Sequence, residues 1–206
     1  MLFNILALIS VLFVLAMLKR IASILPMMAT CLIRKKENIT IDTSLKLRTE
    51  RDLAAASMLL PFCLAASRFR LYDAGFMTGM TDNAVIGITA GVFIGYILLR
   101  SALAAAIRPK RIPSAIYHAA ISTAHTYFFL LTLLMLVTGG LMSACGAGQH
   151  IIKTTMFWLS GTIYTLYLIR KMQIFSSGCN LFVSFLYLCA LEILPTGVLI
   201  TSAVIF

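Results

Sequence analysis

Glu192 is the residue of this sequence best placed to do chemistry, because it stands far inside an apolar run that begins at Leu181. An α-helix rises about 1.5 Å per residue, so Glu192 lies roughly 17 Å along such a helix. That depth is near the middle of a hydrocarbon core about 30 Å thick. An ionisable group there is costly to bury and is a functional candidate by default, while a hydrogen bond that locks the helices is the structural alternative. The sequence leaves both interpretations open.

His125 is the expected partner of Glu192. It lies about ten residues into another apolar run, which places it roughly 15 Å deep by the same helical rise. A Glu–His pair could relay protons or could simply satisfy its own hydrogen bonds. His118, Ser122, His125 and Thr132 share one helical face, which we expect to point into the bundle. Two histidines seven residues apart rarely serve one iron, so we expect neither a cofactor nor a metal.

Arg100 and Pro195 complete the candidates for a functional site. Arg100 lies about seven residues from the end of its apolar run, and we expect its long side chain to extend toward headgroups rather than turn inward to a carboxylate. Pro61 and Pro195 should kink their helices, because proline lacks the backbone N–H that a helix needs. Broken helices together with buried acids mark substrate sites in transporters.

Gly87, Gly91 and Gly95 recur every four residues and form two overlapping GxxxG units. Such a stripe lets another helix approach closely. Packing within the same chain is the favoured interpretation, and contact with a second copy or with the helix of another membrane protein is the alternative.

The composition identifies the surroundings in which these residues act. Of the 206 residues, 61% are hydrophobic and only 12% are charged, and the mean hydropathy is +0.98. A soluble domain is nearer half apolar and about a quarter charged. A soluble chain of this size could not hide so much apolar surface in one core. We therefore predict an all-α fold, a polytopic transmembrane helical bundle of about six spans, with residues 1–206 forming a single integral membrane domain.

Apolar runs close to the roughly 20 residues needed to cross a bilayer alternate with polar gaps. Residues 21–33 form a shorter run containing Pro26, which we expect to continue the first helix or to lie at the interface; as a separate span it would raise the count to seven. The only long polar segment is 34–52, and the glycine-rich stretch 139–150 predicts a loop. The predicted spans are 2–18, 53–71, 84–107, 115–137, 151–169 and 181 to the C-terminus.

The net charge of +10 is distributed unevenly along the chain. Lys and Arg cluster in alternate gaps, whereas the gaps 73–83 and 139–150 contain neither residue. The positive-inside rule then predicts that both chain ends face the non-cytoplasmic side and that segment 34–52 is cytoplasmic. This pattern favours membrane lipid as a partner and argues against nucleic acid.

Other signatures are missing from the sequence. Its five cysteines are odd in number and include no CxxC pair, so a disulfide framework or a zinc site is not expected. No basic residue precedes the first apolar run, and we expect that run to be a retained span rather than a signal peptide. The sequence contains no Walker loop, GxSxG, HExxH or dinucleotide motif, which favours a protein that is not an enzyme.

Three stretches resemble one family: SLKLRTERDLAAAS, then SRFRLYD, and finally NLFVSFLYLCALEILPTGVLI. They are similar to integral membrane proteins of Bacteroidota that carry only a domain-of-unknown-function label. The resemblance implies a bacterial inner (cytoplasmic) membrane setting, multi-pass, and brings no established activity. It adds weight to Glu192 and Pro195. The C-terminal motif of the family is represented here by Tyr187, Leu188, Cys189, Leu191, Glu192, Ile193, Leu194 and Pro195.

Three functions are compatible with these features. The first is an accessory, assembly or anchoring subunit of an envelope complex, which small size and the glycine stripe favour. The alternative is a small proton-coupled transporter that uses a midplane Glu/His pair. An intramembrane enzyme acting on a lipid ranks last, because no Asp-rich metal motif is present.

Overall fold

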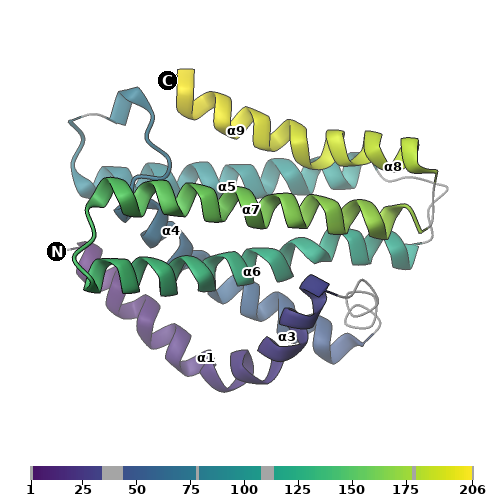
Figure 1. Cartoon of the computed structure of the whole chain (residues 1–206), viewed down its shortest axis with the longest axis horizontal. Coiled ribbons are helices and arrows are strands. Elements are labelled where there is room, and N and C mark those ends of the chain that lie inside the picture. The colour runs from purple at the N-terminus through teal and green to yellow at the C-terminus, as the bar shows by residue number, and fades with distance from the viewer. Residues whose placement is uncertain (1, 34–43, 78, 108–113, 178–179, 206) are drawn as a thin grey trace.

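The computed structural model describes residues 2–33, 44–77, 79–107, 114–177 and 180–205. The basic clusters at 34–36 and 108–111, together with Cys179, lie outside these ranges. Within them every regular element is helical, which confirms the predicted all-α fold. Figure 1 shows the helices within residues 82–205 lying side by side along one axis, with the N-terminal helix oblique to them. In chain order the elements are α1 (Leu2–Ile33), α3 (Leu45–Ser57), α4 (Leu59–Arg68), η1 (Gly75–Met77), α5 (Asp82–Ala106), α6 (Ser114–Ala144), α7 (Gln149–Phe175), α8 (Leu181–Leu188), η2 (Cys189–Ile193) and α9 (Leu194–Ile205).

Helix α1 includes both the first predicted span and the shorter apolar run after it. It is one helix with Pro26 inside it, and Figure 1 shows it bent near its middle. A proline within a helix removes one backbone hydrogen bond and commonly causes such a bend. Ile21, Ile24 and Met28 are buried against α3 and α6. The second run therefore continues the first helix, as expected.

The second predicted span is divided into α3 and α4, which meet at Met58. Pro61 lies in the first turn of α4. Its ring would clash with the carbonyl of Ser57, four residues earlier, and α3 ends at that residue. The kink predicted for Pro61 is therefore present as a break between two helices.

The predicted loop 139–150 is wrong at its start, because α6 continues through Gly139 and Gly140 to Ala144. A Cβ atom on Gly139 would lie 2.6 Å from Cε of Met156 on α7. Gly139 therefore lets Met156 and Phe69 pack closely against α6, and it does not end the helix. Of the four glycines, only Gly146 and Gly148 lie in the loop, which runs from residue 145 to residue 148.

The last span contains a π-helical turn, η2, between α8 and α9. The backbone N–H of Leu194 donates to the carbonyl oxygen of Cys189, five residues earlier. Pro195 follows at once and has no N–H to donate to the carbonyl of Leu191. The disturbance predicted for Pro195 is therefore present as this wider turn.

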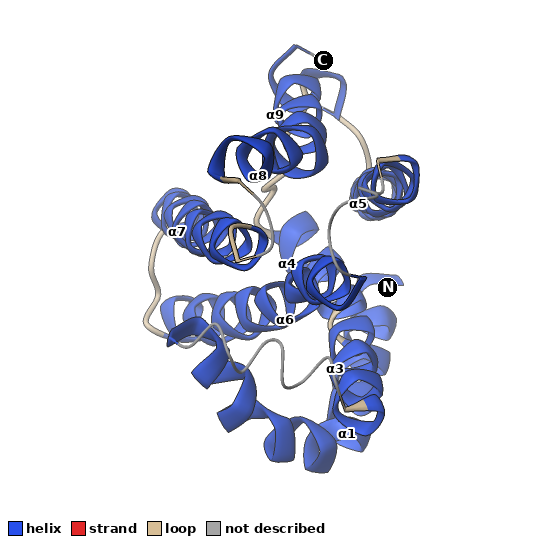
Figure 2. Ribbon diagram, turned by 90° about the vertical axis from the view of Figure 1, so that its right-hand side faces the viewer, coloured by secondary structure: helices blue, strands red, loops and turns tan. Residues whose placement is uncertain are grey.

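Four helices of the described chain are long and apolar enough to cross a membrane. They correspond to the first, third, fourth and sixth predicted spans, so the predicted count of about six is approximate. Figure 2 shows α1 and α3 on one side of α6, with α8 and α9 on the opposite side beyond α5 and α7. The candidate spans are Phe3–Thr30, Asp82–Ala106, Ile116–Ala144 and Leu181–Ala203.

Candidate functional site

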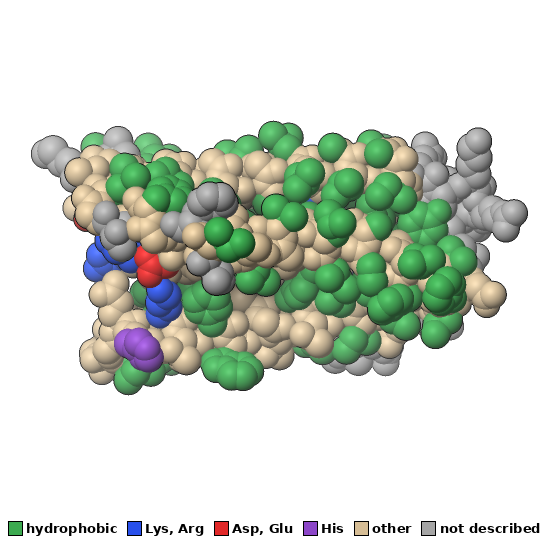
Figure 3. Space-filling model, turned by 90° about the horizontal axis from the view of Figure 1, so that it is seen from above, with side chains coloured by type: hydrophobic (Ala, Val, Ile, Leu, Met, Phe, Trp, Pro, Cys, Tyr) green, Lys and Arg blue, Asp and Glu red, His purple; other side chains and the backbone are tan. Residues whose placement is uncertain are grey.

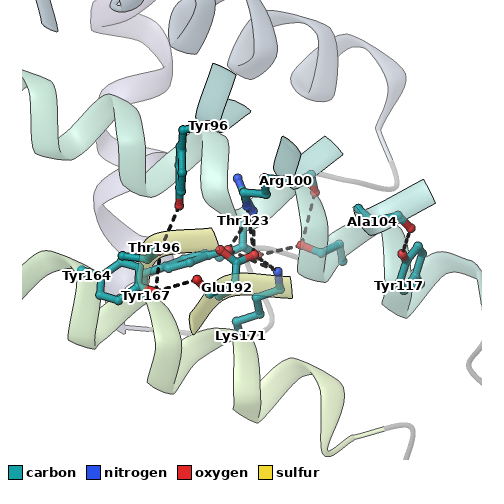
Figure 4. Close-up of polar contacts among 12 residues, drawn as sticks. Tyr96, Arg100, Ala104, Tyr117, Thr123, Tyr164, Tyr167, Lys171, Glu192 and Thr196 are labelled. Carbon is teal, nitrogen blue, oxygen red and sulfur yellow. Dashed lines mark hydrogen bonds and ion pairs between the residues drawn. The ribbon is translucent and has the colours of Figure 1, made fainter. Parts of the chain in front are cut away.

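Three helical segments bring Arg100, Lys171 and Glu192 together, and we refer to these residues as the charge triad (Figure 4). Nε and Nη2 of Arg100, on α5, lie 3.0 and 2.9 Å from Oε1 of Glu192 in the π turn. Nζ of Lys171, on α7, donates to the same oxygen. The side chains of Lys171 and Glu192 are each 1% exposed, and that of Arg100 is 21% exposed. The triad therefore joins α5, α7 and the last span inside the bundle.

The hydroxyl of Tyr167 connects the two cations of the charge triad. It accepts a hydrogen bond from Nη2 of Arg100 at 2.8 Å and another from Nζ of Lys171 at 3.2 Å. The guanidinium of Arg100 also lies 5.8 Å from the centre of the Tyr167 ring, and the ammonium of Lys171 lies 5.7 Å from it. Cations are attracted to an aromatic ring at such distances, and the attraction grows when water is absent. Tyr167 therefore adds a second hydrogen-bond acceptor for the two cations, beside the single carboxylate of Glu192.

A second polar layer surrounds the π turn. The hydroxyl of Tyr164 lies 3.2 Å from the backbone oxygen of Glu192, to which it can donate, and 3.0 Å from Oγ1 of Thr196. The hydroxyl of Tyr96 lies 3.2 Å from the same Thr196 oxygen. A π turn departs from the regular hydrogen-bond ladder of the helix, and such turns are frequent at functional sites. Side chains from α5 and α7 thus hold the turn from two sides.

The spacing of these residues explains why they meet. Tyr96 and Arg100 are four residues apart on α5, and Glu192 and Thr196 are four apart on the last span. On α7, Tyr164, Tyr167 and Lys171 follow the spacing i, i+3, i+7. Each set therefore lies along one face of its helix. The sequence therefore contains a signal for this site, namely polar residues at helical intervals in three apolar runs.

Lys171 was missed as a site residue because the fifth span was predicted to end at Ile169. Basic residues beyond that point were counted as loop charges. In the structure α7 continues to Phe175, so Lys171 lies a full turn inside the helix and is buried. A transmembrane helix can therefore continue past a charged residue when that residue has a partner of opposite charge inside the bundle.

Two predicted arrangements of site residues are wrong. Arg100 does not extend toward headgroups; it turns inward to Glu192. His125 is not the partner of Glu192, because Nδ1 of His125 lies 2.8 Å from Oδ1 of Asp52 on α3. The depth of a residue along its helix does not say toward which neighbour its side chain points.

The contact between Asp52 and His125 is a half-exposed ion pair, with side-chain exposures of 37% and 48%. Asp52 precedes the apolar run that enters the bundle. Burial raises the pKa of Asp52, but the hydrogen bond from His125 and the positive charge of Arg51 outweigh burial and hold the pKa below its ordinary value. Asp52 is therefore a carboxylate at neutral pH and can attract a protonated His125.

The predicted inward face of α6 is divided in the structure. Ser122 and Thr132 are buried, whereas His118 and His125 are exposed. The buried hydroxyls donate to backbone oxygens within α6, at 3.2 Å for Ser122 and 2.9 Å for Thr132. Across the described ranges, His, Cys, Asp and Glu form no group of three that could hold a metal ion.

The glycine stripe on α5 faces outward. Gly87, Gly91 and Gly95 are all exposed, and a Cβ atom built on any of them meets no other atom within 4 Å. The favoured interpretation, packing of this stripe within the chain, is therefore wrong. The stripe is instead open to a helix from outside.

The charge triad can hold the bundle together or carry charge. Whether a cavity reaches the triad bears on both roles. Two cavities, of about 630 and 620 Å³, lie at the end of the bundle where the N-terminus is found. Neither is lined by Arg100, Lys171 or Glu192. In this arrangement Lys171 and Glu192 are buried within the triad's ion pairs, and Arg100 remains partly exposed.

Comparison with known families gives a match over nearly the whole chain. The family model described as "Domain of unknown function (DUF4271)" matches residues 3–202, nearly the whole sequence. Comparison with curated proteins and with solved structures gives no match. The resemblance to a family with a domain-of-unknown-function label is confirmed, whereas its Bacteroidota origin and its C-terminal motif stay predictions. The chain, a helical protein with spans apolar enough for a membrane, belongs to the DUF4271 family.

Proposed function

We propose that this protein is a multi-pass protein of the bacterial inner membrane and serves as an accessory, assembly or anchoring subunit of an envelope complex. The observation that carries the proposal is the outward stripe of Gly87, Gly91 and Gly95. In a bilayer, small residues let two helices approach closely enough for van der Waals packing and for contacts between backbones. An exposed GxxxG stripe with no helix packed on it therefore favours a partner helix.

The opposite face of α5 supports this role. Arg100 and Gly91 are nine residues apart in the helix, which is about two and a half turns and places them on opposite sides. Arg100 binds Glu192, and Tyr96 contacts Thr196, so the inner face of α5 is held by polar contacts to the last span. A helix fixed on one side presents its other side with little loss of conformational freedom, which favours binding.

Purification of the tagged protein from its native membrane in mild detergent, followed by mass spectrometry, tests this proposal. We expect a stoichiometric partner with the wild type and its loss with Gly91→Leu, which fills the stripe. Gly161→Leu is the matched control, because Gly161 is also an exposed helical glycine with open space around its Cα. If only the single chain is recovered after crosslinking, the proposal is wrong. A second tag distinguishes another membrane protein from a second copy of this chain.

A small proton-coupled transporter is the second candidate function. The charge triad favours it, because ionisable residues inside a membrane bundle mark ion and proton pathways, and π turns are frequent at functional sites. Its centre would be Glu192 with Arg100 and Lys171 rather than Glu192 with His125. Proton flux into proteoliposomes should then fall in the variants Glu192→Gln and Lys171→Met. The second variant keeps the ion pair between Arg100 and Glu192. Unchanged flux in both folded variants would exclude this function.

A further inference from the structure

A polar cavity lies at the end of the bundle where α4 ends and α5 and α7 begin. Its volume is about 620 Å³. Figure 3 shows Lys, Arg, Asp, Glu and His side chains gathered at one end of the molecule, next to a long surface with few charges. We refer to this space as the basic cavity. The polar residues that line it are Asn4, Ser67, Arg68, Arg70, Asp82, Gln149, His150 and Lys153.

Arg70 has an unusual backbone conformation. Its φ angle is +46°, and it is the only non-glycine residue of the described chain with a positive φ. The N–H of Arg70 donates to the carbonyl of Ser67 at 3.2 Å, and the N–H of Leu71 donates to that of Ala66 at 2.9 Å. This pair of hydrogen bonds is the Schellman motif, in which the left-handed residue after the helix is usually glycine.

The same chain shows the usual form of this motif at the end of α6. There Gly146 has φ +71°, its N–H donates to Ser143 at 3.1 Å, and the N–H of Ala147 donates to Met142 at 3.0 Å. The left-handed conformation costs an L-residue roughly 1–2 kcal/mol, a cost that glycine avoids. Strained residues of this kind cluster at binding sites. Arg70 therefore occupies this position at a conformational cost, and it lines the basic cavity.

Charge is not balanced around this cavity. Lys153 is paired with Asp73 at 2.7 Å, and Asp82 supplies one further carboxylate. Arg68 lies over the ring of Phe3 at 6.0 Å. Within the described ranges, neither Arg68 nor Arg70 has an ion-pair partner. Two guanidinium groups thus remain available to an anion.

The start of α7 adds to this positive potential. Gln149 and His150, its first two residues, line the basic cavity. The N-cap residue, Gly148, gives no side-chain hydrogen bond, and the first turn contains no acidic residue. Unpaired N–H groups and the helix dipole favour an anionic group at such a terminus. Helix and arginines therefore attract the same kind of ligand.

An apolar crevice adjoins the basic cavity. Its volume is about 630 Å³, and it lies between α1, α4 and α6, with lining residues such as Val11, Leu64 and Met135. Phe3, Arg68, Phe69 and Gln149 line both spaces. A basic pocket that continues into an apolar crevice matches an amphiphile with an anionic head and a hydrocarbon tail.

We propose that this pair of spaces binds a phospholipid, with its phosphate group held by Arg68 and Arg70 and an acyl chain in the apolar crevice. Arginine presents a fork of N–H donors that fits phosphate oxygens. The site is separate from the outward glycine stripe on α5, so it can be present whether or not a partner helix binds there.

The variant Arg70→Gly tests this site without threatening the fold, because glycine is the unstrained residue at that position. The full chain in uncharged detergent is titrated with dioleoylphosphatidylglycerol and, separately, with inorganic phosphate. Binding is followed by native mass spectrometry and by thermal unfolding. We expect the lipid to bind the wild type and to raise its unfolding temperature. Arg70→Gly should unfold at the same or a higher temperature without lipid and bind the lipid at least tenfold more weakly.

The matched control is Lys46→Gln, which removes an exposed positive charge on α3, outside both spaces. It should bind the lipid like the wild type, which separates a site from attraction to the overall charge. Equal lipid binding by Arg70→Gly and the wild type, or no bound lipid at all, would overturn the proposal. A response to inorganic phosphate without a response to the lipid would overturn the lipid assignment.

Discussion

Arg100 and Lys171 donate to the same carboxylate oxygen, Oε1 of Glu192, from opposite helices. Two cations therefore depend on one anion inside the bundle, with the Tyr167 hydroxyl as a shared acceptor. Such an arrangement is asymmetric, because loss of the anion leaves two uncompensated charges while loss of one cation leaves a balanced pair. The stability of the protein should show this asymmetry.

Glu192→Gln should destabilise the protein far more than Lys171→Met. Removing one partner of a buried ion pair costs about 3–5 kcal/mol, because the remaining charge stays buried without compensation. Lys171→Met removes the excess cation and leaves Arg100 paired with Glu192. Thermal unfolding of both variants in the same detergent, followed by circular dichroism, measures the difference. Equal losses would show that the charge imbalance has no energetic effect.

Tyr164→Phe should loosen the π turn by removing the hydroxyl that contacts the carbonyl of Glu192 and the side chain of Thr196. A typical hydrogen bond contributes about 1 kcal/mol, which corresponds to a fall of about 2–4 °C in unfolding temperature for a chain of this size. Tyr187→Phe is the control, since the hydrogen bonds that hold the turn do not involve the Tyr187 hydroxyl and its ring stacks near that of Phe175. Equal effects of the two substitutions would contradict a specific role for Tyr164.

Gly139 and Gly140 should respond in opposite directions to alanine. A Cβ on Gly139 would lie 2.6 Å from Cε of Met156 and 3.1 Å from Cε2 of Phe69, whereas one on Gly140 meets nothing within 4 Å. Gly139→Ala should therefore cost about 1–3 kcal/mol through overpacking. Gly140→Ala should gain up to about 1 kcal/mol through helix propensity. The measurement is again thermal unfolding, and a stabilised Gly139→Ala would show that Met156 moves aside freely.

The ion pair between Asp52 and His125 should contribute less than about 1 kcal/mol, because both side chains are half exposed. Asp52 has a pKa below its ordinary value of about 3.9, so its contribution is present above that pH and is lost as the pH falls through the folded-state pKa. A double-mutant cycle with Asp52→Asn and His125→Gln measures the coupling. The coupling should shrink as the pH falls below about 3.9 toward the lower folded-state pKa of Asp52. A coupling that stays constant as the pH is lowered through this region would contradict the assignment.

Hydrophobic patterning predicts much of this fold but not its interior contacts. Apolar runs located α5, α6 and the last span to within a few residues at the start of each helix, because lipid-facing and buried positions are both apolar. The end of α6 was misplaced because Gly139 serves close packing rather than termination. Sequence patterns do not distinguish these two uses of glycine.

Two members of the charge triad, Glu192 and Arg100, were functional candidates from the sequence, but only Glu192 was expected to be buried. Glu192 is recognisable because a carboxylate in an apolar run is costly to bury without a hydrogen-bond or ion-pair partner. Its true partners depend on the rotation of three helices about their own axes, which the depth of a residue does not determine. The i, i+4 spacing of Tyr96 with Arg100 and of Glu192 with Thr196 would have pointed to the correct faces.

The π turn also determines which way the side chains of α9 point around the helix axis. A five-residue turn contains about one residue more than a regular helical turn needs, and each residue rotates an α-helix by about 100°. Removal of a single residue such as Ala190 would let a regular helix form and would turn α9 relative to α8 by that angle. Glu192 would then leave the face shared with Arg100 and Lys171. One residue of chain length thus decides which helices the last span is joined to, and a relative lacking that residue would have to assemble its bundle differently.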